Sequence, residues 1–330
     1  MMSSNQNSNA VVSSLALTEQ ARYFDYRMAS NPLSGEGAIA PVTSPWFGSE
    51  LHESGPTGIV TLDNAKSLGC EGAATSPALC ASFVRIHPGD HQATDAEATS
   101  QLFFVIRGTG STQVGGANIK WSKGDIFILP ARSPAVHQAT ADAALYWVHD
   151  GPLLTYLGAE ATRQRFSPTL YQSDAIRKKL DEIVRDPSSA KANRLSVLLG
   201  HENFPQTKTI THVIWAMYGR LPVGAVQAPH RHQAVALDLV VECEPGCYTM
   251  VGSSLDKDGR IKDGTRFDWK PGSAFVTPPG LWHSHHNESG SIAHILPIQD
   301  AGLHTYLRTL NILFTRRKKD GSYEIVTDAS

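Results

Sequence analysis

The sequence lacks the features of a membrane, secreted or nucleic-acid-binding protein. Its 330 residues contain no apolar run that approaches the ~18 residues of a membrane span, and its N-terminus lacks the basic start of a secretory signal. The four cysteines are too few for a disulfide scaffold and show no C-x-x-C spacing (Cys70, Cys80, Cys243 and Cys247). A formal net charge of −2 gives no reason to expect nucleic acid or an anionic membrane as a partner. We therefore predict a cytoplasmic protein with reduced thiols.

Two histidine-rich stretches carry the strongest chemical signal. The first contains His230 and His232, and the second, about fifty residues later, contains His283 and His285. Nearby residues are rich in β-branched side chains and predict strands (238–241 and 275–277). Because side chains at i and i+2 share one face of a strand, each pair points the same way. Two such strands side by side would bring three or four imidazoles together inside a barrel, which predicts a metal site.

The rest of the chain predicts strands joined by one clear helix. Strand-like segments with Gly-containing turns between them form a first barrel (82–87, 102–106 and 125–129). Residues 172–186 have apolar side chains at helical spacing and end at Pro187, which predicts a connecting helix. A further helix is predicted over 17–29 with Thr18 as its N-cap, followed by an extended arm to residue 80.

The two barrels form an internal repeat. Trp121–Pro130 aligns with Trp269–Pro278 at one constant offset of 148 residues, from 121 to 269 and from 130 to 278. At that offset His283 falls opposite Ala135, and His137 is left without an H-x-H partner upstream. A single histidine is not enough to hold a metal ion. We therefore expect the first barrel to lack a metal site.

The second barrel carries the residues of a known pattern. Ala228-Pro-His-Arg-His, continuing to Glu244, and Val276-Thr-Pro-Pro with Trp282-His-Ser-His-His-Asn resemble the two cupin motifs. More narrowly they resemble the gentisate 1,2-dioxygenase group, which includes salicylate and 1-hydroxy-2-naphthoate dioxygenases. The resemblance is specific over about 80 residues and architectural elsewhere.

The resemblance implies an all-β bicupin, with two double-stranded β-helix (jelly-roll) barrels, an N-terminal arm and a helical connector. The predicted segments are an arm with one helix, a metal-free N-terminal cupin, the connector, a metal-binding C-terminal cupin, and a C-terminal helix and tail (1–80, 81–155, 156–207, 208–300 and 301–330). Cupins of this kind commonly assemble, so a homo-oligomer, a dimer or a tetramer, is expected.

The same resemblance implies a site and a reaction. His230, His232 and His283 would hold Fe(II), leaving three positions open for substrate and O2. His285 matches a histidine beside the substrate, and Trp215 matches a substrate-side aromatic residue. The implied activity is an extradiol-type dioxygenase of aromatic catabolism. It would cleave a 2-hydroxybenzoate between the carboxyl- and hydroxyl-bearing carbons, the substrate being gentisate, salicylate, or a nitro-, amino- or halosalicylate.

One departure from the family pattern leaves alternatives open. Asp238 stands where the family has an arginine that faces the substrate carboxylate, so Arg220 becomes our candidate anchor. Asp238 itself is a candidate catalytic residue, either as a fourth metal ligand or as a group that orients a histidine. The alternative is a side chain at the end of a strand that faces solvent and has no catalytic role. The competing hypotheses are a decarboxylase or quercetinase-like oxygenase using another metal, and a non-enzymatic ligand-binding bicupin.

Overall fold

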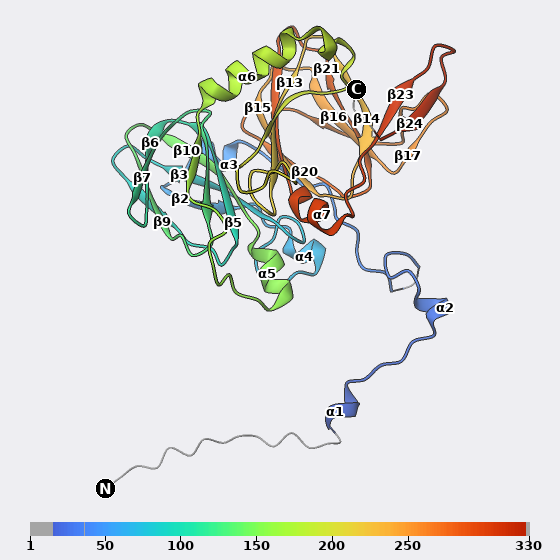
Figure 1. Ribbon diagram of the computed structural model, residues 1–330, viewed down its shortest axis with the longest axis horizontal. Coiled ribbons are helices and arrows are strands. Elements are labelled where there is room, and N and C mark those ends of the chain that lie inside the picture. The colour runs from blue at the N-terminus through green and yellow to red at the C-terminus, as the bar shows by residue number, and fades with distance from the viewer. Residues whose placement is uncertain (1–15, 36, 328–330) are drawn as a thin grey trace. The chain divides into compact units, whose positions relative to one another are not determined.

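Figure 1 shows the computed structural model, which describes residues 16–35 and 37–327. The described residues up to Pro41 form one compact unit, and the chain from Val42 onward forms another. In the first unit the predicted helix over 17–29 is wrong, because two single-turn helices stand there, α1 (Ala16–Glu19) and α2 (Tyr26–Ala29). Asp25 accepts a hydrogen bond from the backbone N–H of Arg27 and so begins a new helix. With no buried side chain in α2, no packing supports a longer helix.

The first barrel combines two antiparallel sheets. One has the strand order β11-β8-β5-β10-β3-β2, and the other β4-β9-β6-β7. The strands are β2 (Gly58–Thr61), β3 (Cys80–Ile86), β4 (His91–Thr94), β5 (Ser100–Arg107), β6 (Thr109–Val114), β7 (Ala117–Ser122), β8 (Ile126–Pro130), β9 (Ala135–Ala139), β10 (Ala143–His149) and β11 (Thr169–Tyr171). The strands predicted over 82–87, 102–106 and 125–129 correspond to β3, β5 and β8.

The second barrel repeats this plan. Its sheets have the orders β1-β20-β15-β22-β13-β12 and β19-β16-β21-β14-β23-β24, and β17 pairs with β18 beside them. The strands are β1 (Trp46–Phe47), β12 (Leu195–Leu199), β13 (Trp215–Leu221), β14 (Val226–Arg231), β15 (Ala236–Glu242), β16 (Cys247–Gly252), β17 (Ser254–Leu255), β18 (Ile261–Lys262), β19 (Thr265–Asp268), β20 (Ala274–Thr277), β21 (Trp282–Asn287), β22 (Ala293–Gln299), β23 (Leu313–Arg317) and β24 (Tyr323–Val326). The all-β prediction is confirmed.

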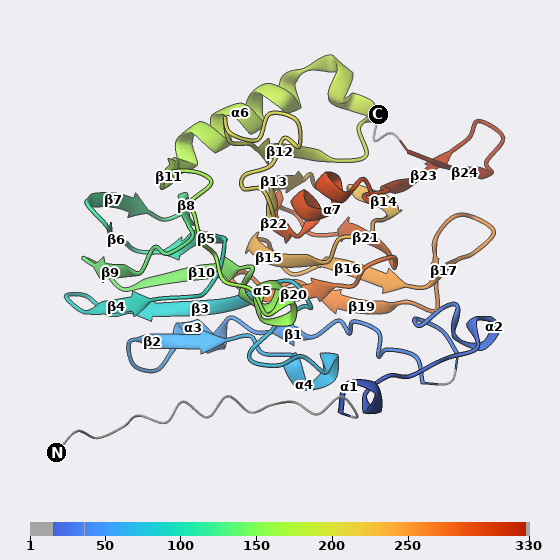
Figure 2. The ribbon, with the colours of Figure 1, turned by 60° about the horizontal axis from the view of Figure 1, so that its bottom comes forward.

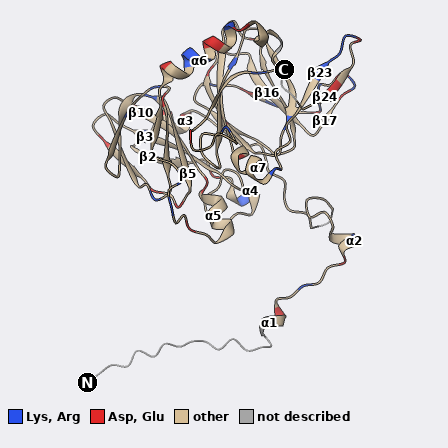
Figure 3. Ribbon diagram, viewed as in Figure 1, with Lys and Arg blue, Asp and Glu red and all other residues tan. Residues whose placement is uncertain are grey.

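Helices are short, with one exception. Besides α1 and α2, they are α3 (Glu50–Glu53), α4 (Ala65–Leu68), α5 (Gly151–Leu157), α6 (Ser173–Arg185), the 3₁₀ helix η1 (Pro187–Lys191) and α7 (Ala301–Leu307). The helix predicted over 172–186 is confirmed as α6, which buries Ile176 and Leu180 and contacts β12 and β13 (Figure 2). Basic and acidic residues are interspersed along α6 (Figure 3). In the described part of the chain, no helix is long and apolar enough to cross a membrane.

Three predicted segments contain elements that the sequence did not reveal. The arm expected to carry one helix also contains α3 and α4, and it adds β1 to the second barrel and β2 to the first. The connector expected to be helical also contains β11 and β12. The C-terminal tail expected after α7 is a hairpin, β23–β24, whose first strand pairs with β14. The limits of the predicted domains themselves stay a prediction.

The two barrels share a hydrophobic core and differ inside. The shared core takes side chains from both, among them Phe83 and Tyr146 of the first barrel and Leu237 of the second. The first barrel is filled by aromatic rings: Phe103 stacks on Phe127 with ring centroids 4.7 Å apart, and Trp147 follows at 5.7 Å. The second barrel carries a cluster of four buried histidines, His230, His232, His283 and His285.

Candidate metal centre and adjoining cavity

The histidines predicted to meet do so on two paired strands. β14 and β21 are antiparallel, with His230 opposite His283 and their ring centroids 4.0 Å apart. The register shifts between Gln227 and His230, where Pro229 has no N–H to give the ladder. His232 lies directly after β14. One nitrogen from each of His230, His232 and His283 falls within 4.8 Å of the others, and all three side chains are buried.

The backbone fixes how each of these rings is protonated. Nδ1 of His230 lies 3.1 Å from the carbonyl of Ala228, and Nδ1 of His283 lies 3.2 Å from that of Leu281. Nδ1 of His232 bonds the carbonyl of Ala234 at 2.8 Å. Since a carbonyl only accepts, each Nδ1 carries the hydrogen and each Nε2 keeps its lone pair.

The three rings are neutral at pH 7. Burial lowers the pKa of His232 to about 4. Burial, helped by neighbouring histidines, also holds the pKa of His230 and that of His283 well below the usual value. No proton has to leave before a metal binds. Three neutral imidazoles with lone pairs on one point suit iron, zinc, copper or nickel, so the donor set fits a metal ion.

His285 is oriented differently. The Oγ1 of Thr249 accepts a hydrogen bond from the indole N–H of Trp269 at 2.8 Å and lies 2.8 Å from Nδ1 of His285. Thr249 is fully buried and its hydroxyl has no other partner among the described residues, so only donation to Nδ1 leaves the hydroxyl hydrogen paired. Nε2 of His285 then carries a hydrogen. This ring presents a donor to the barrel interior, whereas the triad presents lone pairs.

The first barrel contains the same arrangement of tryptophan, threonine and histidine, but there the Nε2 atom of the histidine also has a hydrogen-bond partner. Trp121 donates to Thr112 at 2.9 Å, and Thr112 lies 2.8 Å from Nδ1 of His137. Nε2 of His137 lies 2.8 Å from the hydroxyl of Thr94. In the second barrel, the described residues offer Nε2 of His285 no such acceptor. The repeat therefore leaves one hydrogen-bond donor free to meet a ligand.

Asp238 lies inside the barrel. It is 1% exposed, which excludes the solvent-facing alternative, and the hydroxyl of Thr277 donates to its Oδ2 at 2.6 Å. Burial raises the pKa of Asp238 to about 6, against the Thr277 hydrogen bond and the charge of Arg194. Its carboxylate is not in the group of donor atoms that lie within 4.8 Å of one another, judged over the residues described.

The two predicted substrate residues lie on β13 and face opposite ways. Trp215 is opposite Gln299, whose amide nitrogen lies 3.4 Å from Nε2 of His232. The buried indole N–H of Trp215 has no partner in the described structure. Arg220 instead binds Asp181 of α6, with Nη1 and Oδ1 3.1 Å apart.

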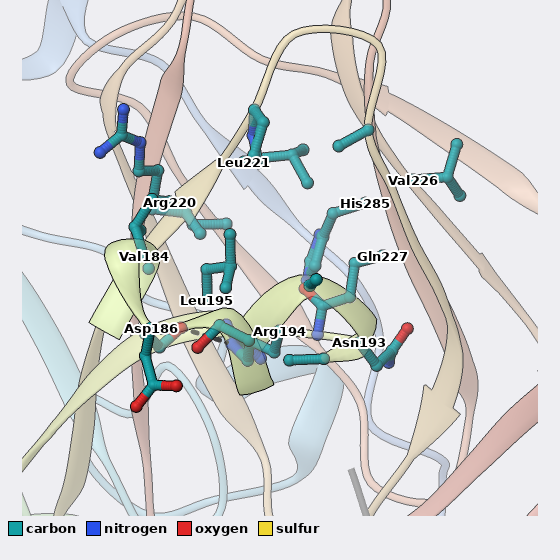
Figure 4. A pocket seen from close by; sticks show the side chains of 18 of the residues that line it. Val184, Asp186, Asn193, Arg194, Leu195, Arg220, Leu221, Val226, Gln227 and His285 are labelled. Atoms are coloured by element: carbon teal, nitrogen blue, oxygen red, sulfur yellow. Dashed lines mark hydrogen bonds between the residues drawn. The ribbon is translucent and has the colours of Figure 1, made fainter. Parts of the chain in front are cut away.

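A cavity of about 390 Å³ adjoins the site (Figure 4). Its lining includes Asn193, Arg194, Arg220, Gln227, Trp269 and His285. The amide nitrogen of Gln227 lies 3.5 Å from Nε2 of His230, which links the cavity to the triad. Of these residues, sequence reasoning missed Asn193, Arg194 and Gln227. Asn193 and Arg194 lie in the connector, which was expected to be helical. No motif or spacing in the sequence singles out Gln227.

Known proteins resemble this chain locally in sequence. No protein-family model matches it. Over 99 residues it is 29% identical to a 5-aminosalicylate 1,2-dioxygenase from a Comamonas species, covering 30% of this chain and 26% of that protein. Over 91 residues it is 32% identical to a 5-nitrosalicylic acid 1,2-dioxygenase from a Bradyrhizobium species, covering 27% and 44%. The matches thus span less than half of the length of either relative.

Solved structures resemble the chain over most of its length. The salicylate 1,2-dioxygenase of Pseudoaminobacter salicylatoxidans, in a structure with gentisate, has a TM-score of 0.63 at 14% identity, covering 82% of this chain and 84% of its own. A point mutant of that enzyme, in complex with gentisate, has a TM-score of 0.66 at 14% identity, covering 94% and 98%. This likeness shows the fold. With the local sequence matches, it supports membership of the gentisate dioxygenase-type bicupin group, at low identity.

Proposed function

We propose that this protein is an Fe(II)-dependent dioxygenase that cleaves the ring of a 2-hydroxybenzoate between its carboxyl- and hydroxyl-bearing carbons. The observation that carries the proposal is the arrangement of His230, His232 and His283, whose lone pairs converge while their Nδ1 hydrogens are held by backbone carbonyls. A metal held by three neutral ligands keeps its charge and its open positions.

When bound, the iron would supply the positions at which substrate and O2 meet and a path for electrons from the aromatic ring to O2. The chain supplies position and hydrogen bonds. Nε2–H of His285 is free to donate to a substrate or oxygen atom at the site, because Thr249 fixes its tautomer. The unpartnered indole N–H of Trp215 offers a second donor, on a residue that lies opposite Gln299, whose amide nitrogen is 3.4 Å from Nε2 of His232. Asp238, bonded to Thr277, adds a buried carboxyl whose protonation changes near pH 6.

The proposed substrate class follows from the relatives and from the cavity. Both quoted sequence relatives are named for substituted salicylates, with an amino or a nitro group. A cavity of about 390 Å³ is within the usual range for a small-molecule site and has room for a ring substituent. Salicylate, gentisate and 5-substituted salicylates are therefore the candidates. We further propose a cytoplasmic location, consistent with the free cysteines, and a homo-oligomer.

Oxygen uptake tests the proposal. The protein is loaded with Fe(II) without oxygen, then mixed with O2 and one of gentisate, salicylate, 5-aminosalicylate, 5-nitrosalicylate or 5-chlorosalicylate. We expect O2 consumption and a ring-opened product with at least one of them. His283→Ala should abolish it. His286→Ala is the matched control, since His286 follows on the same strand but stacks on Tyr248 instead. No turnover of any of these acids by iron-loaded protein would contradict the proposal.

The alternative with another metal rests on Asp238 as a fourth ligand. It receives less support, because the carboxylate is bonded to Thr277 and stands outside the group of converging donors among the residues described. Asp238→Ala separates the two hypotheses. A dioxygenase with three histidine ligands keeps its metal in this variant, whereas a four-ligand cupin loses it.

A further inference from the structure

Two buried carboxamides lie beside the histidine triad. Gln227 is 5% exposed and lies on β14, and Gln299 is 2% exposed and is the last residue of β22. The amide nitrogen of Gln227 lies 3.5 Å from Nε2 of His230, and that of Gln299 lies 3.4 Å from Nε2 of His232. Each carboxamide thus contacts the ring atom whose lone pair faces the metal site.

The backbone brings each carboxamide to its histidine. On a regular strand, Gln227 and His230 would point to opposite faces. The register of β14 against β21 shifts between these two residues, and this irregularity accounts for their contact on one face. Gln299 is fixed by its neighbour Asp300, whose carboxyl oxygen accepts the backbone N–H of Val235 at 2.9 Å in the loop between β14 and β15. Both contacts are therefore built into the barrel.

The tautomers of the histidines decide the direction of these contacts. Because Nδ1 of His230 and Nδ1 of His232 carry the hydrogen, each Nε2 can only accept. A carboxamide oxygen in the same place would face a lone pair, so the NH2 group must point to the ring. In Gln299 this orientation leaves the buried Oε1 without a partner among the described residues, and the bond to His232 is what orients the carboxamide.

A metal ion needs those same lone pairs. Binding at Nε2 removes the acceptor of each amide, and the positive ion repels the N–H that faces it. The two hydrogen bonds therefore stabilise only the metal-free triad. We propose that Gln227 and Gln299 are positioning residues that compete with the metal ion: they keep the empty triad assembled and lower its metal affinity. The inference rests on the metal centre of the proposed function, and it does not depend on the reaction.

This competition has a thermodynamic signature. A variant without one amide loses a hydrogen bond in the metal-free protein and loses none in the metal-bound protein. By linkage, the metal affinity rises by the same factor by which the folding equilibrium constant of the metal-free protein falls. The net contribution of one hydrogen bond gives about two- to tenfold for each residue. An amide that only supported the fold would lower the stability of both forms equally and leave the affinity unchanged.

Metal affinity and stability are measured together. Calorimetry with Zn²⁺, a redox-inert probe, in competition with a chelator gives the affinity at pH 7, and urea unfolding gives the stability of the metal-free protein. Gln227→Leu and Gln299→Leu remove the amide without adding a thioether, which binds metals. We expect each to bind Zn²⁺ about two- to tenfold more tightly and to lose stability by the same factor.

Gln101→Leu is the matched control. Gln101 is a buried glutamine of the first barrel, where its side-chain oxygen accepts the indole N–H of Trp147 at 3.1 Å. Its loss should lower stability and leave the Zn²⁺ affinity unchanged, because Gln101 has no contact with the triad among the described residues.

Two results would overturn the inference. Unchanged Zn²⁺ affinity in the two variants would mean that the amides do not compete for the lone pairs, and weaker binding would mean that they help to hold the ion. Gln227 and Gln299 are tested independently, so one variant decides if the other does not fold. Failure of the proposed function has other signatures. Wild-type protein that binds no metal ion would reject the centre and this inference together, whereas competition without O2 uptake on any acid would retain the inference and reject the dioxygenase.

Discussion

Four neighbouring histidines have two different roles, which depend on the hydrogen-bond partner of each Nδ1 atom. Three rings bond a backbone carbonyl and turn a lone pair inward, while His285 bonds the hydroxyl of Thr249 and turns an N–H inward. The H-x-H spacing revealed the four residues but not this distinction, because the tautomer depends on Thr249 and Trp269, far away in the sequence.

Replacing Thr249 with valine tests the role assigned to His285. Without the hydroxyl, Nδ1 of His285 loses its donor and the inward N–H is no longer enforced. We expect metal content to be retained and kcat of the iron-loaded enzyme to fall about tenfold to a hundredfold. Thr112→Val is the control, because Thr112 makes the same contacts in the first barrel. Equal kinetic effects of the two substitutions would contradict the assignment.

Asp300 provides a prediction about pH. Burial raises the pKa of Asp300 to about 7, although the backbone N–H of Val235 bonds its carboxylate at 2.9 Å. A folded-state pKa above the unfolded one means that the folded protein binds the extra proton. The contribution to stability is thus full below about pH 4 and is lost as pH rises toward 7.

The expected loss is on the order of a few kcal/mol of unfolding free energy. Asp300→Asn keeps an oxygen for Val235 and cannot ionise, so it should unfold with a flatter pH profile and be more stable than wild type at pH 8. Urea unfolding from pH 4.5 to pH 8 measures this difference. Parallel profiles for the two proteins would show that Asp300 does not titrate as described.

At the scale of elements, the C-terminal hairpin supports the metal strand. β23 pairs with β14, where Phe314 lies opposite His230 and stacks on its ring with centroids 5.9 Å apart. The hydroxyl of Thr315 donates to the carbonyl of Pro229 at 3.0 Å. The sequence did not predict this hairpin, since only a C-terminal helix and tail were expected over 301–330.

Phe314→Ala tests that support. Losing the stacked ring should cost about 1 kcal/mol of stability and loosen His230, so a metal chelator should remove the ion faster than from wild type. Ile325→Ala in the same hairpin is the control, since Ile325 is exposed. If chelation rates were the same for both variants and wild type, the hairpin would have no part in holding the triad.

At the scale of the whole molecule, His52 links the barrels. Its Nδ1 lies 2.7 Å from Nη1 of Arg107 in β5, and its Nε2 lies 3.0 Å from the carbonyl of Gly272 in the turn before β20. Burial lowers the pKa of His52, which keeps Nδ1 free to accept from Arg107. The two barrels are therefore joined by hydrogen bonds as well as by the shared core.

His52→Ala should weaken this junction. One buried and one partly buried hydrogen bond are lost, so we expect the free energy of unfolding to fall by about 2–4 kcal/mol and one calorimetric transition to separate into two. His91→Ala, an exposed histidine of the first barrel, should leave the melting profile unchanged. A profile for His52→Ala that matches the control would contradict this account of the junction.

The sequence was most informative where function is encoded within one strand. The i, i+2 spacing predicted that the histidines meet, as His230, His232 and His283 do, whereas the all-β fold was predicted from the resemblance to the cupin motifs. Strand pairing between distant segments left no such pattern. The segment that forms β12 was therefore predicted as part of a helical connector. For the same reason, Arg194 was not predicted to line the cavity.

Metal analysis of the purified protein and its variants tests the central claim most directly. The account predicts one bound ion per wild-type chain, loss of that ion in His283→Ala, and its retention in His285→Ala. The reason is that His283 turns a lone pair toward the site, whereas His285 turns an N–H inward. Retention of the ion by His283→Ala, or its loss from His285→Ala, would contradict the three-histidine centre.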